Sequence, residues 1–348
     1  MSDTPTAFSI QFRRALFAGA LMIFGMLNTA AAQNLYQMHQ DGKIWRFTGS
    51  PCSGDSCPGW QMLDNNPATK AIVASGGKLY QLHNSGKIWR FTGTPCSGNS
   101  CPGWQMLDNN PATNAIVAGG DNLYQRHNDG KIWIYTGTAC SGNSCPGWQM
   151  LDNNPATSAI FASDSGNFLY QTHNDGKIWI STGTPCTGDS CPGWQLLDNN
   201  PATSSLTASR PGGFADTATL FQIHNLGKIW RYTGTPCSGN SCPGWQMLDN
   251  NPSSKTIVSI AGRLFQMHNG GKIWHYTNTP CSGNSCPGWE MLDNNSATVT
   301  IVGGRERLYQ MHNGGKIWRW TGTPCSGNSC PGWQMLDNNP KTKIIVAN

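Results

Sequence analysis

One segment recurs seven times along this chain, and that repetition limits the possible folds more than any other feature. Its copies begin at Leu35, Leu79, Leu123, Leu169, Leu220, Leu264 and Leu308, with spacings of 44, 44, 46, 51, 44 and 44 residues. A fixed period of about 20 to 50 residues is typical of solenoids, propellers and other repeat architectures. The copies occupy nearly all of the chain from residue 35 onward, so one repeat must account for the whole fold.

Each copy contains four short apolar or aromatic runs. In the copy that starts at Leu79, the runs cover residues 79–83, 87–92, 103–107 and 115–118, and Gly, Asn and Pro lie between them. Such runs predict β-strands, and no helical period is long enough to compete. Four antiparallel strands per repeat make one propeller blade, whereas a trefoil cannot hold seven units and an open solenoid needs polar caps. We therefore predict an all-β, seven-bladed β-propeller of four-stranded antiparallel blades.

The first and last segments predict how the ring closes. The segment Leu35–His39 corresponds to the second strand of a blade, and Ile344–Ala347 corresponds to the first strand of a further blade. We expect the C-terminal strand to complete the N-terminal blade.

Residues 1–32 have the pattern of an export signal. Arg13 and Arg14 precede an apolar run from Ala15 to Leu27, and three alanines, 30–32, precede Gln33. This is the order of a signal peptide, and the run is shorter than the roughly 20 residues of a membrane span. We predict a signal peptide over 1–32, a single propeller domain over 33–348, no membrane span in the mature chain, and a secreted or periplasmic location. An uncleaved anchor is the alternative.

The 14 cysteines form seven pairs with one spacing, C-x4-C. Behind an export signal, paired thiols are typical of an oxidising compartment. The repeated spacing favours bridging within each pair, and metal binding together with the recurrent histidine is the alternative. Each short bridge should contribute only about 2 kcal/mol. The predicted disulfides are Cys52–Cys57, Cys96–Cys101, Cys140–Cys145, Cys186–Cys191, Cys237–Cys242, Cys281–Cys286 and Cys325–Cys330.

The charge balance gives little reason to expect a nucleic-acid partner. From residue 33 onward the chain has 21 basic and 17 acidic side chains, and charged residues make up only 12% of the sequence. A nucleic-acid footprint needs Lys and Arg clustered on one face. The abundance of uncharged polar and aromatic residues suits uncharged polar ligands instead.

Four residue types that recur unchanged in every copy are candidates for binding. A sugar needs an aromatic plate for its CH face and fixed hydrogen-bonding groups for its hydroxyls. Trp45, His39, Asp64 and Asn65 supply those chemical types, and Lys43 adds a contact for a carboxylated or sulfated sugar. The candidate carbohydrate-binding residues are His39, Trp45, Asp64, Asn65, His83, Trp89, Asp108, Asn109, His127, Trp133, Asp152, Asn153, His173, Trp179, Asp198, Asn199, His224, Trp230, Asp249, Asn250, His268, Trp274, Asp293, Asn294, His312, Trp318, Asp337 and Asn338.

Each of these residue types also has a structural interpretation. Trp45 and Trp60 are suited to packing between blades, and His39 and Asp64 to a buried hydrogen-bond network. The Asn-Asn-Pro stretch is typical of a turn that satisfies its own backbone.

The short motifs Leu-Tyr-Gln-x-His, Gly-Lys-Ile-Trp, Pro-Gly-Trp and Leu-Asp-Asn-Asn-Pro together resemble the repeats of tectonin and tachylectin-type propellers. The resemblance covers the chain from residue 33 onward, and only the sevenfold recurrence of the motifs makes it specific. It implies a lectin with sugar sites in or between blades, and glycans or glycoconjugates on cell surfaces as partners. The Cys pair and the Asp-Asn-Asn-Pro turn depart from that family, so its sugar preference does not carry over.

We predict no enzymatic activity, no cofactor and no metal site. A catalytic site needs groups with different roles, whereas seven near-identical blades offer seven equal aspartates. The insertion that contains Arg210 and Asp216 is the asymmetric exception. A scaffold for protein–protein interaction is the alternative function, since fold does not fix function. Sevenfold repetition favours repeated ligands, because linked weak sites gain avidity.

Strand order predicts which loops share a rim of the ring. The loop between the second and third strands should lie with the Asp-Asn-Asn-Pro turn, and the loop between the first and second strands with the Cys loop. We expect ligand on the first of these rims. The third and fourth copies replace Arg46 and Phe47 by Ile134 and Tyr135 and by Ile180 and Ser181, which predicts weaker sites there if those positions contact ligand.

Overall fold

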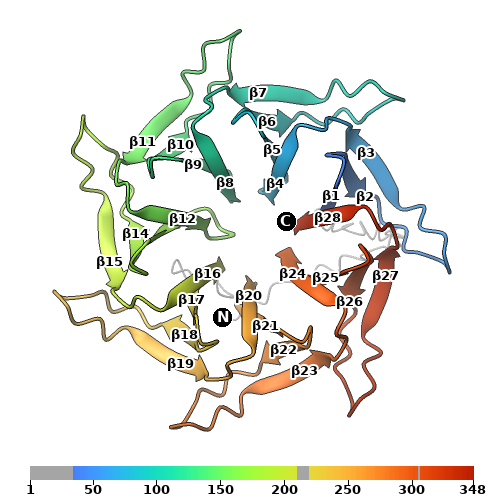
Figure 1. Ribbon diagram of the computed structural model, residues 1–348, viewed down its shortest axis with the longest axis vertical. Coiled ribbons are helices and arrows are strands. Elements are labelled where there is room, and N and C mark those ends of the chain that lie inside the picture. The colour runs from blue at the N-terminus through green and yellow to red at the C-terminus, as the bar shows by residue number, and fades with distance from the viewer. Residues whose placement is uncertain (1–33, 210–218, 305) are drawn as a thin grey trace, which may run out of the picture. The chain divides into compact units, whose positions relative to one another are not determined.

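The computed structural model describes residues 34–209, 219–304 and 306–348, and these form seven four-stranded antiparallel sheets arranged as blades of one ring (Figure 1). In six blades the strands follow one another in sequence from the centre of the ring outward, and in the remaining blade the C-terminal strand stands innermost. The predicted signal peptide and the insertion with Arg210 and Asp216 lie outside the described residues. The seven-bladed propeller fold is confirmed.

Of the two inner strands of each blade, the second is buried along nearly its whole length. The innermost strands, in blades 2 to 7 and then blade 1, are β4 (Thr69–Ser75), β8 (Thr113–Gly119), β12 (Thr157–Ala162), β16 (Thr203–Ser209), β20 (Ser254–Ile260), β24 (Thr298–Gly304) and β28 (Thr342–Ala347). The second strands, in blades 1 to 7, are β1 (Leu35–His39), β5 (Lys78–His83), β9 (Asn122–His127), β13 (Leu169–His173), β17 (Thr219–His224), β21 (Arg263–His268) and β25 (Arg307–His312).

The two outer strands form a hairpin in each blade. The third strands are β2 (Ile44–Phe47), β6 (Ile88–Phe91), β10 (Ile132–Tyr135), β14 (Ile178–Ser181), β18 (Ile229–Tyr232), β22 (Ile273–Tyr276) and β26 (Ile317–Trp320). The fourth strands are β3 (Trp60–Asp64), β7 (Trp104–Asp108), β11 (Trp148–Asp152), β15 (Trp194–Asp198), β19 (Trp245–Asp249), β23 (Trp289–Asp293) and β27 (Trp333–Asp337).

The C-terminal strand closes the ring as predicted. β28 pairs with β1 in antiparallel register, from Leu35 opposite Ala347 to His39 opposite Thr342, so blade 1 is built from both ends of the propeller. Because a strand without a neighbour leaves its N–H and C=O groups unpaired, this closure removes the free inner edge that β1 would otherwise present.

The core lies between blades rather than within one. Alternate residues of a strand face opposite sides of its sheet. Tyr36, Met38 and Leu63 of blade 1 therefore pack against Ile72 and Leu79 of blade 2, and equivalent clusters fill the other seams. The tryptophan that begins each fourth strand adds a polar contact across the seam, as in the 2.9 Å bond from Trp104 Nε1 to Leu63 O.

All seven predicted disulfides are present, and each lies in the loop between the third and fourth strands. We call this segment the disulfide loop; in blade 2 it covers residues 92–103. Figure 1 shows these loops reaching to the periphery of the ring before each fourth strand. The disulfides are typical of an oxidising environment outside the cytosol.

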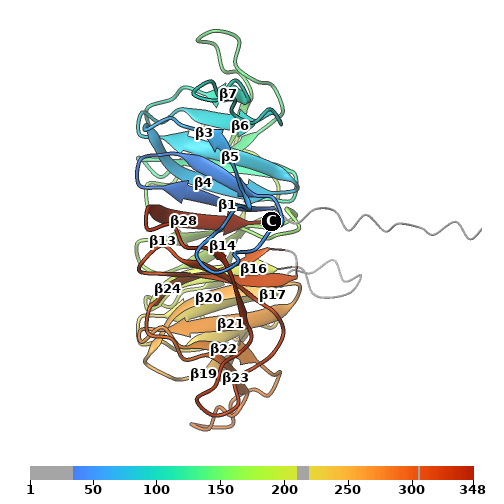
Figure 2. The same cartoon turned by 90° about the vertical axis from the view of Figure 1, so that its right-hand side faces the viewer.

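The side view shows strands crossing the ring, with their connections at its two rims (Figure 2). We call one the Asn rim; it carries the Asp-Asn-Asn turns and the loops between second and third strands. Gly42 and Asn66 show how tightly these pack, since a Cβ at Gly42 would lie 2.3 Å from Asn66 O. The opposite rim, which we call the variable rim, carries the loops between first and second strands.

One part of the predicted loop arrangement is wrong. The disulfide loop starts and ends at the variable rim, but it bends across the fourth strand of the preceding blade, where Cys96 N donates to Met62 O at 3.1 Å. Its tip therefore reaches the Asn rim, at Asn65. Strand order alone does not show this crossing, because it depends on contacts with another blade.

Candidate functional site

Each blade buries one histidine against one tryptophan at its seam with the preceding blade. His39 ends β1, and Trp45 lies opposite Gln37 on the same face of the sheet. The two ring centroids are 5.7 Å apart with an interplanar angle of 29°. All seven copies of the pair repeat this contact. The pair therefore belongs to the architecture of every seam.

One ring nitrogen of each histidine and the indole nitrogen of each tryptophan have no partner among the described residues. His39 Nε2 and Trp45 Nε1, with their six sets of equivalents, are buried and make no hydrogen bond to any described residue. The histidines are only 4 to 8% exposed. Burial lowers the pKa of His39 and of its equivalents below the ordinary value, because a buried imidazolium loses its hydration. The imidazoles are thus kept neutral at neutral pH.

The aspartate of each blade takes part in a buried network that crosses the seam. Asp64 Oδ2 accepts a 2.9 Å bond from Gln81 Nε2 of the next blade, and Thr69 Oγ1 donates to Gln81 Oε1 at 2.7 Å. The same amide-to-carboxylate bond occurs at six of the seams. Burial raises the pKa of Asp64 and of Asp337. The expected structural network exists, but its partners are glutamine and threonine rather than histidine.

The asparagine that follows each aspartate holds the neighbouring disulfide loop. Asn65 Nδ2 donates to Asn99 O at 3.0 Å, across the seam between blades 1 and 2. The equivalent bond is present in all seven blades, and Asn338 to Asp55 closes the circle at 2.9 Å. This asparagine therefore has a defined structural partner.

The four residue types proposed from sequence thus lie at the seams but do not form one open site. The histidine and aspartate side chains are buried, whereas the tryptophans and asparagines are partly exposed. Whether any of them contacts a sugar stays a prediction. Their visible role is to fix the position of one blade against the next.

Two cavities open at the seams on either side of blade 4. In blades 1, 2, 5 and 7 an arginine on the third strand donates to a glutamine on the fourth, as Arg46 does to Gln61 at 2.8 Å. Blades 3 and 4 have Ile134 and Ile180 at this position, opposite Gln149 and Gln195. The shorter side chains leave these amides without the arginine partner and leave space in the seam.

The larger cavity lies between blades 4 and 5 and has a volume of about 590 Å³. Its wall includes the aromatic rings of Phe168 and Tyr232, the exposed amide of Gln195 and the Thr233 hydroxyl. The second cavity, between blades 3 and 4, has about 470 Å³ and includes Phe168, Gln149 and Ser181. Both combine aromatic surface with free hydrogen-bonding groups.

The residues at which the third and fourth copies depart from the repeat lie at these cavities. The substitutions at Ile134, Ile180 and Ser181 are visible in the sequence as departures from the repeat, and there they predicted weaker sites. In the structure the same three residues line the two cavities beside blade 4. The prediction about ligand affinity itself remains untested.

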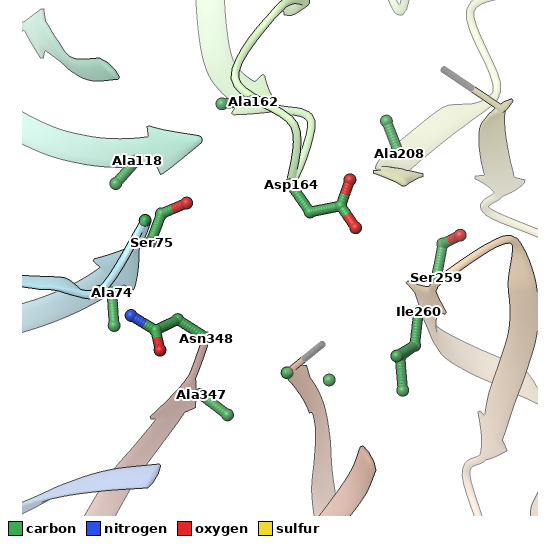
Figure 3. A pocket seen from close by; sticks show the side chains of 14 residues that line it. Ala74, Ser75, Ala118, Ala162, Asp164, Ala208, Ser259, Ile260, Ala347 and Asn348 are labelled. Atoms are coloured by element: carbon green, nitrogen blue, oxygen red, sulfur yellow. The ribbon is translucent and has the colours of Figure 1, made fainter. Parts of the chain in front are cut away.

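A third hollow lies where the central channel meets the variable rim. Figure 3 shows its lining converging from the innermost strands, and the side chains are mostly those of alanine, glycine and serine. Its volume is about 320 Å³, and Asp164 supplies a carboxylate. Small side chains let seven strands approach the axis, but they offer a ligand few functional groups.

Across the described stretches of the chain, no three His, Cys, Asp or Glu side chains gather as a metal site would require. No helix in those stretches has the length and apolar character needed to cross a membrane.

Seven four-stranded blades around one channel define the class of this protein as a seven-bladed β-propeller, and comparison with solved structures agrees. Prp20p from Saccharomyces cerevisiae matches with a TM-score of 0.51 and 8% identity, over 88% of this chain and 85% of that chain. Apo AztD from Citrobacter koseri matches with a TM-score of 0.51 and 9% identity, over 91% and 98%. At such low identity these similarities show the fold alone. No family model and no curated protein matches the sequence.

Proposed function

We propose that this protein is a secreted or periplasmic carbohydrate-binding protein without enzymatic activity, and that it binds sugar at the seams between blades. The observation that carries the proposal is the pair of cavities beside blade 4, with their aromatic walls and free amides. The resemblance of the repeats to tectonin and tachylectin-type propellers supports the same conclusion.

The larger cavity has the size and the chemistry for a sugar residue. Sites for small ligands are typically about 300 to 1,000 Å³, with a few polar groups placed on an apolar wall. Phe168 and Tyr232 provide ring surface for CH groups, while Gln195 and Thr233 provide donors and acceptors for hydroxyls. In this proposal, the recurrent His, Trp, Asp and Asn residues set the width of the seam beside the cavity.

The first experiment is a glycan-array screen of oxidised protein from Gln33 to Asn348, followed by calorimetry on the best ligand. We expect selective binding with a stoichiometry of more than one site per chain. A silent array from a folded, disulfide-intact sample would contradict the proposal and favour a protein scaffold.

The matched variant is Ile180→Arg. Blade 4 should then form the arginine–glutamine pair that blades 1, 2, 5 and 7 already carry, so the arginine fills the larger cavity without harming the fold. We expect at least a tenfold loss of affinity, about 1.4 kcal/mol, at that site. Ile180→Val serves as the control, because it leaves the cavity open. Unchanged binding by Ile180→Arg would exclude this cavity as the site.

A further inference from the structure

Every blade presents one lysine on the Asn rim, in the loop between its second and third strands. The loop packs on the Asp-Asn-Asn turn of the same blade, as the close approach of Gly42 to Asn66 shows. The seven equivalent residues are Lys43, Lys87, Lys131, Lys177, Lys228, Lys272 and Lys316.

The lysines differ in whether an acid neutralises them. In blades 1, 3 and 4, an aspartate two residues earlier pairs with the lysine, at 2.9, 2.7 and 2.6 Å. The lysine lowers the pKa of each of these aspartates, mainly through the side-chain hydrogen bond. In blades 2, 5, 6 and 7 the earlier position is Ser85, Leu226, Gly270 or Gly314, and the lysine is exposed.

A second set of lysines lies closer to the channel on the same rim. The innermost strands begin with a bulge directly after the Asp-Asn-Asn turn, and the extra residue is Lys70, Lys255 or Lys343 in blades 2, 6 and 1. Lys341 is exposed beside Lys343. The corresponding bulge residues in blades 3, 4, 5 and 7 are Asn114, Ser158, Ser204 and Val299, which carry no charge.

Together the two sets occupy one contiguous part of the ring, which we call the lysine sector; blades 2 and 6 carry a lysine of each set without an acid partner. It runs from blade 5 through blades 6, 7 and 1 to blade 2. Its exposed acids on this rim, among the residues with described positions, are Asp41, paired with Lys43, and the peripheral Asp55. The conserved aspartates of the repeat are buried against glutamines. The lysines of the sector without an acid partner are Lys70, Lys87, Lys228, Lys255, Lys272, Lys316, Lys341 and Lys343.

We propose that the lysine sector binds an acidic polysaccharide, a linear chain that carries carboxylates or sulfates. Exposed ammonium groups spread along an arc match a ligand with repeated charges better than a single anion in a pocket. Together they maintain a positive potential, although salt screens each charge beyond about 8 Å at physiological ionic strength. The inference goes beyond the seam cavities, which lie beside variable-rim residues such as Phe168.

Other polyanions fit the sector less well. Proteins that hold single-stranded nucleic acid add exposed aromatic rings for base stacking. The exposed large hydrophobic side chains of the described residues are Leu226 and Val299, and neither is aromatic. An anionic membrane surface would accept lysines together with Leu226, so vesicles are included in the test.

The test measures binding of the oxidised propeller, residues 33–348, to immobilised polygalacturonate and dextran sulfate, with neutral dextran as the reference. We expect binding to both polyanions, with an affinity that falls steeply between about 50 and 200 mM salt. If the propeller binds neither polygalacturonate nor dextran sulfate, the inference is overturned. Equal or tighter binding to phosphatidylserine vesicles would overturn it in favour of a membrane surface.

The decisive variant places aspartates where blades 1, 3 and 4 already have them: Leu226→Asp, Gly270→Asp and Gly314→Asp together. A Cβ at Gly270 or at Gly314 meets nothing within 4 Å, so the fold should tolerate the change. Because three lysines gain an acid partner, we expect affinity for polyanions to fall at least about tenfold and the salt dependence to weaken.

The control changes net charge equally on the variable rim, by Lys78→Gln, Arg263→Gln and Arg307→Gln. Its affinity should stay within about threefold of the unmodified protein if the sector is the site. Equal losses in both triple variants would show that only net charge matters and would refute the inference. Ile180→Arg should keep its affinity for polyanions even if it loses sugar binding at the seam. A negative result for the seam sites is thereby distinguished from a negative result for the lysine sector.

Discussion

Each blade places a histidine Nε2 and a tryptophan Nε1 where they are buried and find no partner among the described residues. A buried polar group without a hydrogen bond costs about 1 to 3 kcal/mol, and it recurs here in seven seams. Buried water is the usual solution at such places. At residue scale, the feature therefore couples the packing of the seams to protonation, because an imidazolium would add a charge where there is little solvent.

We predict that acid destabilises the propeller between about pH 6.5 and pH 5. The unfolded chain takes up protons near pH 6.5, whereas burial lowers the pKa of all eight folded histidines. The histidines therefore do not lower the free energy of unfolding above pH 6.5, and they lower it increasingly as the pH falls below that value. Each histidine lowers the free energy of unfolding by at most about 1.4 kcal/mol per pH unit. Asp64 and Asp337, whose pKa is raised, oppose this trend, because each takes up its proton at a higher pH in the folded chain than in the unfolded chain.

Urea unfolding at about pH 7.5 and pH 5.5 measures this effect through the change in midpoint. His173→Phe keeps a ring against Trp179 and removes the titrating nitrogen, so the difference between the two pH values should shrink. A midpoint independent of pH would contradict the assignment.

At the scale of elements, the disulfide loop connects neighbouring blades as well as the two strands that it joins. At the start of the loop, Cys96 N donates a hydrogen bond to Met62 O of the preceding blade. At its tip, Asn99 O accepts a hydrogen bond from Asn65 Nδ2 of that blade. The sulfur bridge shortens the loop so that both contacts form together. The seven disulfides thus support the seams around the periphery, where the hydrophobic clusters end.

We predict that Cys96→Ser with Cys101→Ser lowers the free energy of unfolding by about 2 kcal/mol and leaves the fold intact. The reason is the entropy of a released short loop, together with weaker contacts to blade 1. Asn65→Ala is the matched comparison, because it removes only the exposed bond to the tip and should cost about 0.5 kcal/mol. Denaturant unfolding of both variants provides the measurement, and equal stability of the double serine variant would refute the role of the bridge.

At the scale of the whole molecule, stability depends on closing the ring. Each hydrophobic cluster takes residues from two blades, so a blade without a neighbour exposes one face. β28 completes blade 1 and also lies between β24 and β4 at the centre of the ring. A single missing strand therefore affects two seams as well as one sheet.

We predict that deletion of residues 342–348 abolishes cooperative unfolding and causes association, because β1 then presents an unpaired edge. A synthetic peptide of residues 340–348 should restore the monomeric, cooperative state. The control deletes only Asn348, whose N–H donates to Asn34 O at 3.1 Å, and should cost no more than about 1 kcal/mol. Calorimetry with size-exclusion chromatography distinguishes these results, and a stable, monomeric truncated ring would contradict the prediction.

The sequence by itself determined the blade count, the order of strands, the disulfide pairs and the closure by Ile344–Ala347. These depend on local signals, namely the short apolar runs, the Gly and Asn turns and the C-x4-C spacing, and their repetition made each signal unambiguous. It also offered a place at the seams between blades as the structural interpretation of His39, Trp45 and Asp64, beside their role as candidates for sugar binding.

Only the tertiary structure decided what those residues contact. Two of these features are hydrogen bonds between blades, from Gln81 to Asp64 and from Asn65 to Asn99. A third is the cavity beside Ile180, which is lined by residues of two blades. Such contacts depend on the distance and angle between neighbouring sheets, which no segment of one repeat encodes locally. The lysine sector likewise becomes visible only when the ring brings blades 5 to 7 beside blades 1 and 2.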